Sequence, residues 1–551
     1  MRTLTRFSLA LAFPLIAEPA AAQIYVANIG GSAPRRVDAL FAKYDSEQAP
    51  GCAVAVIQAG RLTYAKGYGM ADLEQGIRIS PSSAFYLAST SKQFTAFSIL
   101  LLQRDGKLAL DDDVRRYVPE LPDFGAPITI RQLLHHTSGL RDYFGLFALR
   151  GWQFDEPLTE RDVLALLARQ RALNFPPGKR HLYSNTGYVL LGLVVKRASG
   201  LSLRDFAARR IFAPLGMALS QFRDDHRQIV RRRAAAYELT ANGFERSEPS
   251  FDVVGDGGLF STVEDLARWD GNFYEPRAGD PATVARMLDR GVLATGDTVY
   301  YANGIEFGSY RGVETLSHAG AYAGYRSELL RFPSYSLTVA VLCNRGDANP
   351  TALAERVADV YLEAALPTET PARVAAVSNR PPVDGRALRR FAGMYWNDAD
   401  ESILRIAVDN GTLRVSGSDP LVPLAPLVFG VEGTQTLYHF DTTGARPGVV
   451  VSRFGLPDER FVAVDSASVD SSQVRRMVGK YRSDEIGVQM TVLLANGRPS
   501  VHWTGALETP LTALFGHTFL ADGGLIVRFA PDDSSLTVSN GRTQRLAFKR
   551  R

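Results

Sequence analysis

The chain changes character near residue 367, and this change limits the folds that it can adopt. Up to residue 366, strand-like runs are mixed with long helical patterns; after a stretch rich in Pro, Ala and Thr at 367–383, only short alternating runs remain, separated by Gly, Asp, Asn and Ser. The run Arg-Arg-Phe-Ala-Gly-Met-Tyr at 389–395 returns 86 residues later as Arg-Arg-Met-Val-Gly-Lys-Tyr at 475–481. Such a repeat predicts two related antiparallel β-domains in tandem, at 384–468 and 469–551.

The first residues predict an exported protein. Arg2 and Arg6 precede an apolar stretch at 7–17, and three alanines at 20–22 provide the small residues that signal peptidase requires. We therefore expect a signal peptide at 1–22, a mature chain that begins at Gln23, and a periplasmic or secreted location. No later stretch is long and apolar enough to span a bilayer. The net charge of +4 is too small to indicate nucleic acid as a partner.

Ser89 and Lys92 place a potential nucleophile and a potential base one helical turn apart. A desolvated lysine can lose its proton near neutral pH and activate a serine without histidine. The same pair also occurs by chance on solvated helices. Here the following run at 94–102 has almost no polar face, which predicts a buried helix. Lys92 at its start is therefore expected to be buried.

The two cysteines, Cys52 and Cys343, each lie in a strand-like run. An oxidising compartment permits a disulfide between them. Because cysteine is commonly buried without pairing, we favour two buried free thiols.

Two further motifs are weak when taken singly. Tyr183-Ser-Asn185 follows a turn signal at 175–178 and precedes a helical run at 187–195. His318-Ala-Gly320 is followed by Ala321 and by a strand-like run at 327–332. An isolated histidine is most often structural, but the small residues beside it allow a substrate to lie against that backbone.

In this order, Ser-x-x-Lys, Tyr-x-Asn and His-x-Gly resemble the three motifs of the serine β-lactamase-like, penicillin-recognising family, over roughly residues 40–345. Connecting segments at 133–140, 175–178 and 211–217 look like the class C branch, and the tandem repeat is similar to that of the D-aminopeptidases. The resemblance implies an α+β fold: a catalytic domain at 23–366, with an antiparallel sheet flanked by helices, then a linker at 367–383 and two small lipocalin-like antiparallel β-barrels.

The resemblance also implies an acyl-enzyme mechanism. Ser89 would attack a carbonyl, Lys92 and Tyr183 would move protons, and Asn185 and Gly320 would contact the substrate. The backbone N–H groups of Ser89 and Ala321 would form an oxyanion hole. His318 would supply a polar or partly cationic group where many relatives carry lysine. Because histidine is mostly neutral at pH 7, strong β-lactamase or carboxypeptidase activity is disfavoured.

The predicted function is a serine hydrolase, a D-stereospecific aminopeptidase or amidase acting on small peptide, amide or ester substrates. A broad carboxylesterase or weak β-lactamase is the alternative within this class, and an inactive penicillin-binding-like sensor or scaffold is the alternative outside it. The histidines show no metal-ligand spacing and no cofactor motif is present, so we predict neither metal nor cofactor. The sequence is compatible with a homodimer and does not decide the oligomeric state. A barrel loop that reaches the active site is also open, and the glycine-rich tips at 430–433 and 496–497 are the candidates.

Overall fold

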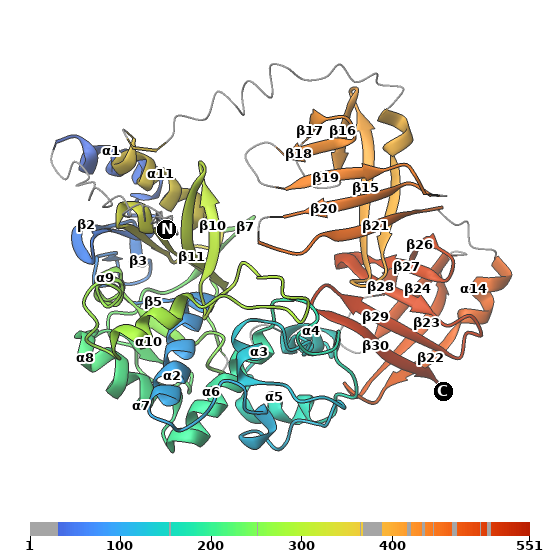
Figure 1. Cartoon of the computed structure of the whole chain (residues 1–551), viewed down its shortest axis with the longest axis horizontal. Coiled ribbons are helices and arrows are strands. Elements are labelled where there is room, and N and C mark those ends of the chain that lie inside the picture. The colour runs from blue at the N-terminus through green and yellow to red at the C-terminus, as the bar shows by residue number, and fades with distance from the viewer. Residues whose placement is uncertain are drawn as a thin grey trace, which may run out of the picture.

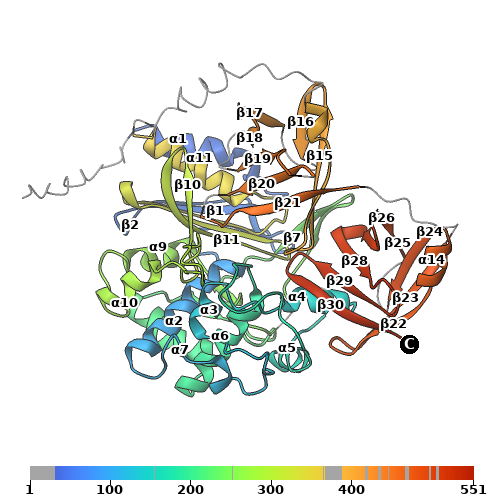
Figure 2. The same cartoon turned by 45° about the vertical axis from the view of Figure 1, so that its right-hand side comes forward.

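A computed structural model describes residues 31–551 apart from 154–155, 251, 364, 367–387, 416–419, 432–435, 445, 454, 466–470, 496–497 and 504–507. The predicted signal peptide at 1–22 and the linker at 367–383 lie outside the described residues. Figure 1 shows an N-terminal unit of mixed helices and strands, with two β-sheet units beside it. Figure 2 shows the same three units from a second direction. The α+β class and the domain order predicted from the sequence are confirmed.

The N-terminal unit is built around one antiparallel sheet in the strand order β10-β11-β12-β13-β1-β2. The outer helices α1 (Ala33–Phe41) and α11 (Pro350–Leu362) cover one face of this sheet. The central strands β1 and β13 are buried on both faces, which explains their continuous apolar sequences. The strands are β1 (Cys52–Gln58), β2 (Arg61–Tyr68), β10 (Glu306–Tyr310), β11 (Val313–Tyr322), β12 (Tyr325–Phe332) and β13 (Leu337–Cys343).

A helical layer packs against the other face of the sheet and forms the largest apolar core. Its two central helices, α2 and α6, contact each other and are buried along most of their length. The sequence predicted this burial for α2 and a helical run for α6. The helices of this layer are α2 (Lys92–Arg104), α3 (Ile130–Leu134), α4 (Tyr143–Leu149), α5 (Glu160–Leu167), α6 (Asn185–Ser199), α7 (Leu203–Ala207), α8 (Ala213–Leu215), α9 (Val263–Gly271) and α10 (Pro281–Ala285). Short strands complete it: β3 (Met70–Asp72), β4 (Ile77–Arg78), β5 (Phe85–Tyr86), β6 (Gln221–Phe222), β7 (Tyr237–Thr240), β8 (Gly243–Arg246) and β9 (Leu259–Ser261).

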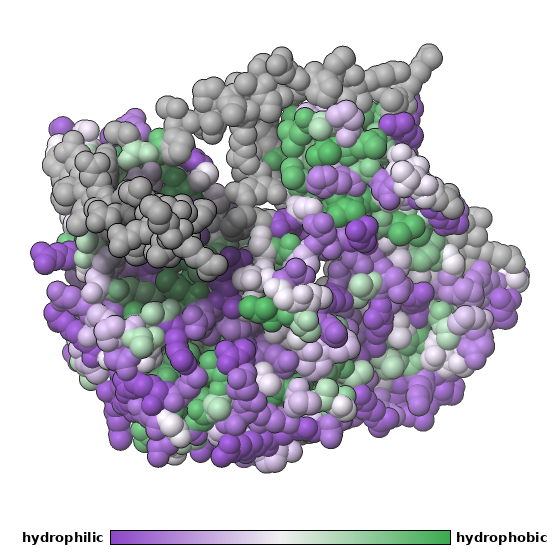
Figure 3. All heavy atoms as spheres, in the orientation of Figure 1, coloured by the Kyte–Doolittle hydropathy of each residue, from purple (hydrophilic) through white to green (hydrophobic). Residues whose placement is uncertain are grey.

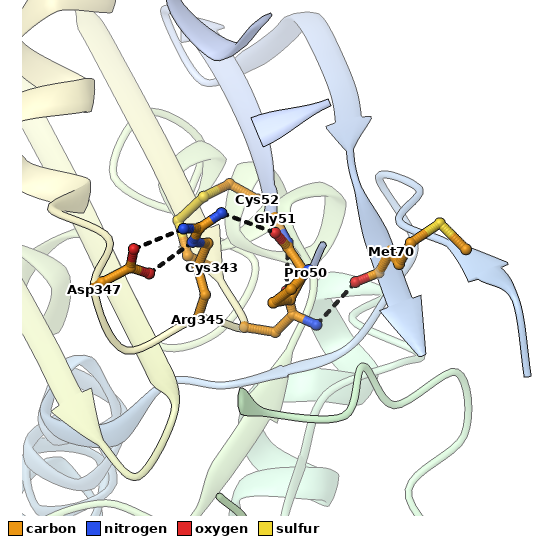
Figure 4. The surroundings of a disulfide bond; sticks show 8 residues. Pro50, Gly51, Cys52, Met70, Cys343, Arg345 and Asp347 are labelled. Atoms are coloured by element: carbon orange, nitrogen blue, oxygen red, sulfur yellow. Dashed lines mark hydrogen bonds and ion pairs between the residues drawn. A yellow bond between two sulfur atoms is a disulfide. The ribbon is translucent and has the colours of Figure 1, made fainter. Parts of the chain in front are cut away.

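Cys52 and Cys343 form a disulfide, so the expectation of two free thiols is wrong. The cysteines lie directly opposite each other on the neighbouring antiparallel strands β1 and β13, with their Cα atoms 4.0 Å apart. Figure 4 shows the bond beside Arg345, whose guanidinium group binds Asp347. The pairing could not be read from the sequence because 291 residues separate the two cysteines, and only the strand order brings them together.

The two C-terminal units are nearly closed antiparallel barrels. In the first, the edge strands β16 and β17 meet at a bridge between Arg414 and Pro420. Its strands are β14 (Gly393–Asn397), β15 (Ser402–Asp409), β16 (Thr412–Val415), β17 (Leu421–Ala425), β18 (Val428–Val431), β19 (Leu437–Asp441), β20 (Gly448–Ser452) and β21 (Glu459–Val464).

The second barrel follows helix α14 (Ser471–Met477). Its strands are β22 (Gly479–Ser483), β23 (Val488–Ala495), β24 (Arg498–Trp503), β25 (Thr509–Pro510), β26 (Thr512–Phe515), β27 (Thr518–Ala521), β28 (Leu525–Phe529), β29 (Ser535–Asn540) and β30 (Thr543–Arg550). The hairpin β29–β30 lies next to α4 in both views (Figures 1 and 2).

The sequence repeat corresponds to a structural repeat. Tyr395 donates a hydrogen bond to the carbonyl oxygen of Phe391 at 2.9 Å, and Tyr481 donates to Met477 at the same distance. Both tyrosines lie on the first strand of their barrel, and this strand pairs with the next one along the chain, β15 in the first barrel and β23 in the second. The two barrels therefore start with the same local fold.

On the face seen in Figure 3, hydrophilic side chains predominate over the helical layer, whereas hydrophobic ones gather on the first barrel. Leu424 and Val462, on strands of this barrel, are 41% and 51% exposed. Within the described part of the chain, no helix combines the length and the apolar character needed to cross a membrane.

Candidate active site

Ser89 lies in a 3₁₀ turn (Ala88–Ser91) that leads directly into α2, which begins at Lys92. Side chains three residues apart eclipse each other in a 3₁₀ turn, and this places the Lys92 amine beside the serine hydroxyl. The distance from Nζ to Oγ is 3.0 Å. The residue before the nucleophile, Ala88, has a φ of 45°, a left-handed conformation that is uncommon for alanine. The backbone is thus held in an unusual shape at the nucleophile, as is frequent at functional sites.

Lys92 is completely buried and makes three hydrogen bonds. Besides Ser89, Nζ donates to Asn185 Oδ1 at 3.0 Å and to the carbonyl oxygen of Asp256 at 2.7 Å. Burial lowers the pKa of Lys92 to about 8, against the opposing effect of the nearby Asp256 and Asp142 carboxylates. The amine is therefore poised to lose its proton close to neutral pH.

Tyr183 lies close to Ser89 and against the lysine, whose Nζ is 5.0 Å from the centre of the phenol ring. Burial raises the pKa of Tyr183 well above its usual value, so the phenol stays protonated at neutral pH. A neutral phenol beside the serine can pass a proton on, but it is not the base that takes one first. Lys92 is the better base because its pKa is shifted toward neutrality.

The backbone of the Tyr-Ser-Asn motif is held by two side chains that the sequence did not identify. The backbone N–H of Ser184 donates to His136 Nδ1 at 3.1 Å, and that of Asn185 donates to Asp142 Oδ2 at 2.7 Å. Asp142 also caps α4. These contacts place the Asn185 amide where α6 begins, in reach of Lys92.

His318 lies on β11 with both ring nitrogens bound to protein groups. Nδ1 is 2.7 Å from the carbonyl oxygen of Ala319, so Nδ1 carries the proton and Tyr301 donates its hydroxyl hydrogen to Nε2 at 2.9 Å. Burial, together with the charge of Lys92, lowers the pKa of His318 to about 3. The imidazole is therefore neutral, and Tyr301 is the partner that the sequence did not reveal.

Strand β11 is joined tightly to the turn that carries the nucleophile. The Thr90 hydroxyl donates to the carbonyl oxygen of His318 at 2.9 Å, and the Ser327 hydroxyl donates to that of Leu87 at 2.8 Å. A Cβ atom on Gly320 would lie only 2.1 Å from the Leu87 carbonyl oxygen. This close approach requires glycine at position 320. The contact between Gly320 and Leu87 brings the backbone of Ala321 near Ser89.

These groups surround one cavity of about 590 Å³, a size suited to a small ligand. Of the predicted residues, Ser89, Tyr183, Asn185, His318, Gly320 and Ala321 line it, and Lys92 lies just beneath. Their catalytic and binding roles stay predictions. Glu306 and Arg542 also line the cavity, and the sequence identified neither.

Glu306 is the first residue of β10, and its side chain has no hydrogen bond or ion pair within the described residues. Burial raises the pKa of this carboxyl group to about 7, although Lys92 and Arg542 act in the opposite direction. A cationic group of a ligand would favour the ionised carboxylate.

Arg542 comes from the turn between β29 and β30 of the second barrel. Its guanidinium carbon is 4.6 Å from the centre of the Tyr183 ring. A barrel turn thus reaches the active site, and it is a turn that the sequence did not single out. Of the glycine-rich tips named from the sequence, 432–433 and 496–497 lie outside the described residues, so their expected role stays a prediction. An exposed Asn-Gly-Arg turn has no local signal that would distinguish it from an ordinary hairpin.

A second cavity, of about 1020 Å³, lies next to α5 and contains no candidate nucleophile from the motifs. Potential metal-ligand atoms of Asp225, His226 and Asp252 lie within 4.8 Å of one another at or near its edge. Arg227 already binds Asp225, and His226 binds Asp252, so these groups satisfy one another. They are separate from the catalytic residues.

The family model described as Beta-lactamase matches residues 37–362. The chain is 30% identical over 358 residues to penicillin-binding protein 4* of Bacillus subtilis, a match covering 62% of this chain and 78% of that protein. It is 28% identical over 463 residues to a D-aminopeptidase of Cereibacter sphaeroides, covering 83% and 84%. Among solved structures, an octameric penicillin-binding protein homologue from Pyrococcus abyssi has a TM-score of 0.54 at 24% identity, covering 78% of this chain and 99% of that one.

Proposed function

This chain belongs to the beta-lactamase family of hydrolases, and we propose that it releases D-amino acids from the N-termini of short peptides and amides through an acyl-enzyme. The observation that carries the proposal is the 3.0 Å contact between the buried Lys92 amine and the Ser89 hydroxyl. This contact supplies an activated nucleophile without a metal or an imidazole base.

The first step follows from the lowered pKa of Lys92 and the raised pKa of Tyr183. Neutral Lys92 takes the proton from Ser89 as Oγ attacks the substrate carbonyl carbon, and the resulting oxyanion accepts hydrogen bonds from the backbone of Ser89 and Ala321. With the pKa of Lys92 at about 8, about a tenth of the enzyme holds this neutral form at pH 7.

The leaving group then departs with a proton. Tyr183 donates its hydroxyl hydrogen to the amide nitrogen as the C–N bond breaks, and the proton that Lys92 took from Ser89 then passes from the ammonium group to the Tyr183 oxygen. The product is an ester between Ser89 and the acyl group. A water molecule attacks this ester along the reverse proton path, which releases the acid and regenerates the serine.

Two observations favour an aminoacyl substrate. The similarity to a D-aminopeptidase extends over 463 residues and so includes more than the beta-lactamase region. The unpaired carboxyl group of Glu306 faces the cavity, where it can bind a substrate ammonium group. A plain esterase would not need this carboxylate.

The test compares hydrolysis of D-alanine and L-alanine p-nitroanilides by the mature protein and by its Ser89→Ala variant. We expect cleavage of the D-isomer only, together with labelling of the protein by a fluorophosphonate probe, and both should be lost in Ser89→Ala. Ser98→Ala is the matched control because Ser98 lies on the helix that follows Ser89, and among the described residues its hydroxyl donates to the Phe94 carbonyl oxygen alone, at 2.8 Å.

Probe labelling without anilide cleavage would contradict the aminopeptidase assignment and would favour an esterase. Absence of labelling in a correctly folded protein would contradict the acyl-enzyme mechanism itself and would favour a sensor or scaffold.

We also propose that the protein is exported. The N-terminal pattern at 1–22 supports this, as does the Cys52–Cys343 disulfide, since such bonds persist in oxidising compartments. N-terminal sequencing of protein recovered from the periplasm should give Gln23 as the first residue, whereas an intact Met1 would contradict export by this route.

A further inference from the structure

The second barrel contributes a charged side chain to the wall of the active site. Arg542 lines the same cavity as Ser89 and Asn185, and its guanidinium group lies over the ring of Tyr183. This residue is 453 positions from the nucleophile along the chain. It reaches the pocket because the hairpin β29–β30 is bound to the helical layer of the N-terminal unit.

The backbone of the turn is held firmly. The carbonyl oxygen of Arg542 accepts hydrogen bonds from the Asp142 N–H at 3.2 Å and from Asn174 Nδ2 at 2.9 Å. The next residue but one, Gln544, donates its N–H to Asn174 Oδ1 at 2.8 Å. Farther from the pocket, the buried Arg141 forms an ion pair with Glu485 of the second barrel at 2.7 Å. Since backbone atoms fix the turn, the Arg542 side chain is free to serve a ligand.

The carboxyl groups of Glu306 and Asp256 line the same cavity as the Arg542 guanidinium group, and Glu306 interacts with it electrostatically without forming an ion pair. Within the described residues Arg542 makes no ion pair and no side-chain hydrogen bond, and its recorded side-chain contact is the stack on Tyr183. Arginine presents five donors in a planar fork that matches a carboxylate, and stacking on a ring leaves the edge of this fork available. His318, by contrast, has both nitrogens occupied.

We propose that Arg542 binds a carboxylate on the leaving-group side of the substrate, so that the enzyme selects short peptides whose released residue carries a free C-terminus. The placement rests on the proposed acyl-enzyme mechanism, in which Tyr183 protonates the leaving group. A carboxylate bound by a guanidinium group that lies on the Tyr183 ring belongs to the part of the substrate that departs from that side.

The test measures kcat/KM for two substrates that differ only in this charge, D-Ala-Gly and D-Ala-Gly-amide, with release of free D-alanine followed by mass spectrometry. We expect the wild-type enzyme to prefer the carboxylate substrate. The preference should fall about ten- to hundredfold in Arg542→Gln, as expected for the loss of a charge-assisted pair, and it should be partly kept in Arg542→Lys.

Charge reversal gives a sharper outcome than neutralisation. In Arg542→Glu the amide substrate should be preferred. Arg498→Gln is the matched control, because Arg498 is an exposed arginine of the same barrel that does not line the cavity. It should leave the preference unchanged. Melting curves of each variant establish that the hairpin stays docked.

Two results would overturn the inference. The ratio of the two kcat/KM values could be the same in Arg542→Gln as in the wild type; if both values then fell by the same factor, Arg542 would act only through Tyr183. A D-Glu-Gly-amide substrate, which carries its carboxylate on the acyl side, could instead be the one affected.

The experiment remains informative if the proposed function is wrong. If neither dipeptide is cleaved but the serine is still labelled by the probe, the same variants are compared on N-acetylglycyl esters of 3-hydroxybenzoate and 3-hydroxybenzamide. Loss of preference for the benzoate ester in Arg542→Gln would then support the carboxylate site without the aminopeptidase assignment, and an unchanged preference would reject the site.

Discussion

Replacing Asp256 by Asn should shift the pH dependence of acylation to lower pH. Asp256 is the strongest of the charges that stabilise the ammonium form of Lys92, whose pKa burial lowers to about 8. The substitution keeps the backbone carbonyl that binds Lys92 Nζ. It also keeps an oxygen that can accept the hydrogen bond from the Tyr143 hydroxyl, which is now 2.9 Å from Oδ2. The variant therefore changes the charge and little else.

The expected size of the shift in the pH dependence follows from the pKa of Lys92. In the wild type, acylation by a neutral ester should fall about tenfold for each pH unit below 8, so the rate at pH 6 is about a hundredth of the plateau. Removing the carboxylate that most raises the pKa of Lys92 should lower that pKa by about one unit. In Asp256→Asn the rate at pH 7 should thus be closer to its own plateau than in the wild type.

The assay follows the burst of p-nitrophenol from p-nitrophenyl acetate, an ester without an ionisable group, between about pH 5.5 and about pH 9.5. Glu306 also lines the cavity and titrates in this range, with a pKa of about 7, so Glu306→Gln is measured in parallel. A midpoint that moves upward in Asp256→Asn, or an acid limb that disappears in Glu306→Gln, would refute the assignment of Lys92 as the base.

Three further changes test how the site is held together. Gly320→Ala should reduce acylation by more than about a hundredfold at unchanged secondary structure, because the added methyl group would collide with the backbone behind the nucleophile; burst kinetics and circular dichroism check this. Arg141→Met should destabilise the chain by about 3–5 kcal/mol by leaving Glu485 buried and unpaired, and adding Glu485→Gln should restore part of the melting temperature. Replacing Cys52 and Cys343 by Ala should cost about 2–5 kcal/mol, seen as a lower melting temperature that no longer responds to reductant.

The part of the site that the sequence predicted is the part formed by local spacing or by ordered motifs. Ser89 lies in a 3₁₀ turn and Lys92 begins the helix that follows it, so three residues of sequence are enough to bring them together. Tyr183 and His318 are distant in sequence, and only the order of the three motifs connected them to the serine. The tandem barrels were predictable because a repeat in sequence is visible without knowledge of the fold.

The rest depended on contacts that no local pattern records. Glu306 begins an ordinary edge strand, and Arg542 sits in a turn like many others. The Cys52–Cys343 bond required the strand order β13-β1, which joins the end of the unit to its beginning. In each case the information lies in how distant segments pack.

The charge of the pocket shows why this matters for specificity. The sequence argument against carboxylate substrates rested on residue 318, because histidine replaces the lysine of many relatives. His318 is neutral and both of its ring nitrogens are hydrogen-bonded, which agrees with that argument. The second barrel, however, places the cation of Arg542 in the pocket. Moreover, Asp142 binds the Arg542 carbonyl oxygen through its N–H and the Asn185 N–H through its carboxylate. Asp142 therefore links the barrel turn to the Tyr-Ser-Asn motif that contacts Lys92. Displacing the barrel would remove the Arg542 cation and would also disturb this motif. On this reasoning the second barrel is retained as a wall of the active site, and no separate binding role is needed to explain it.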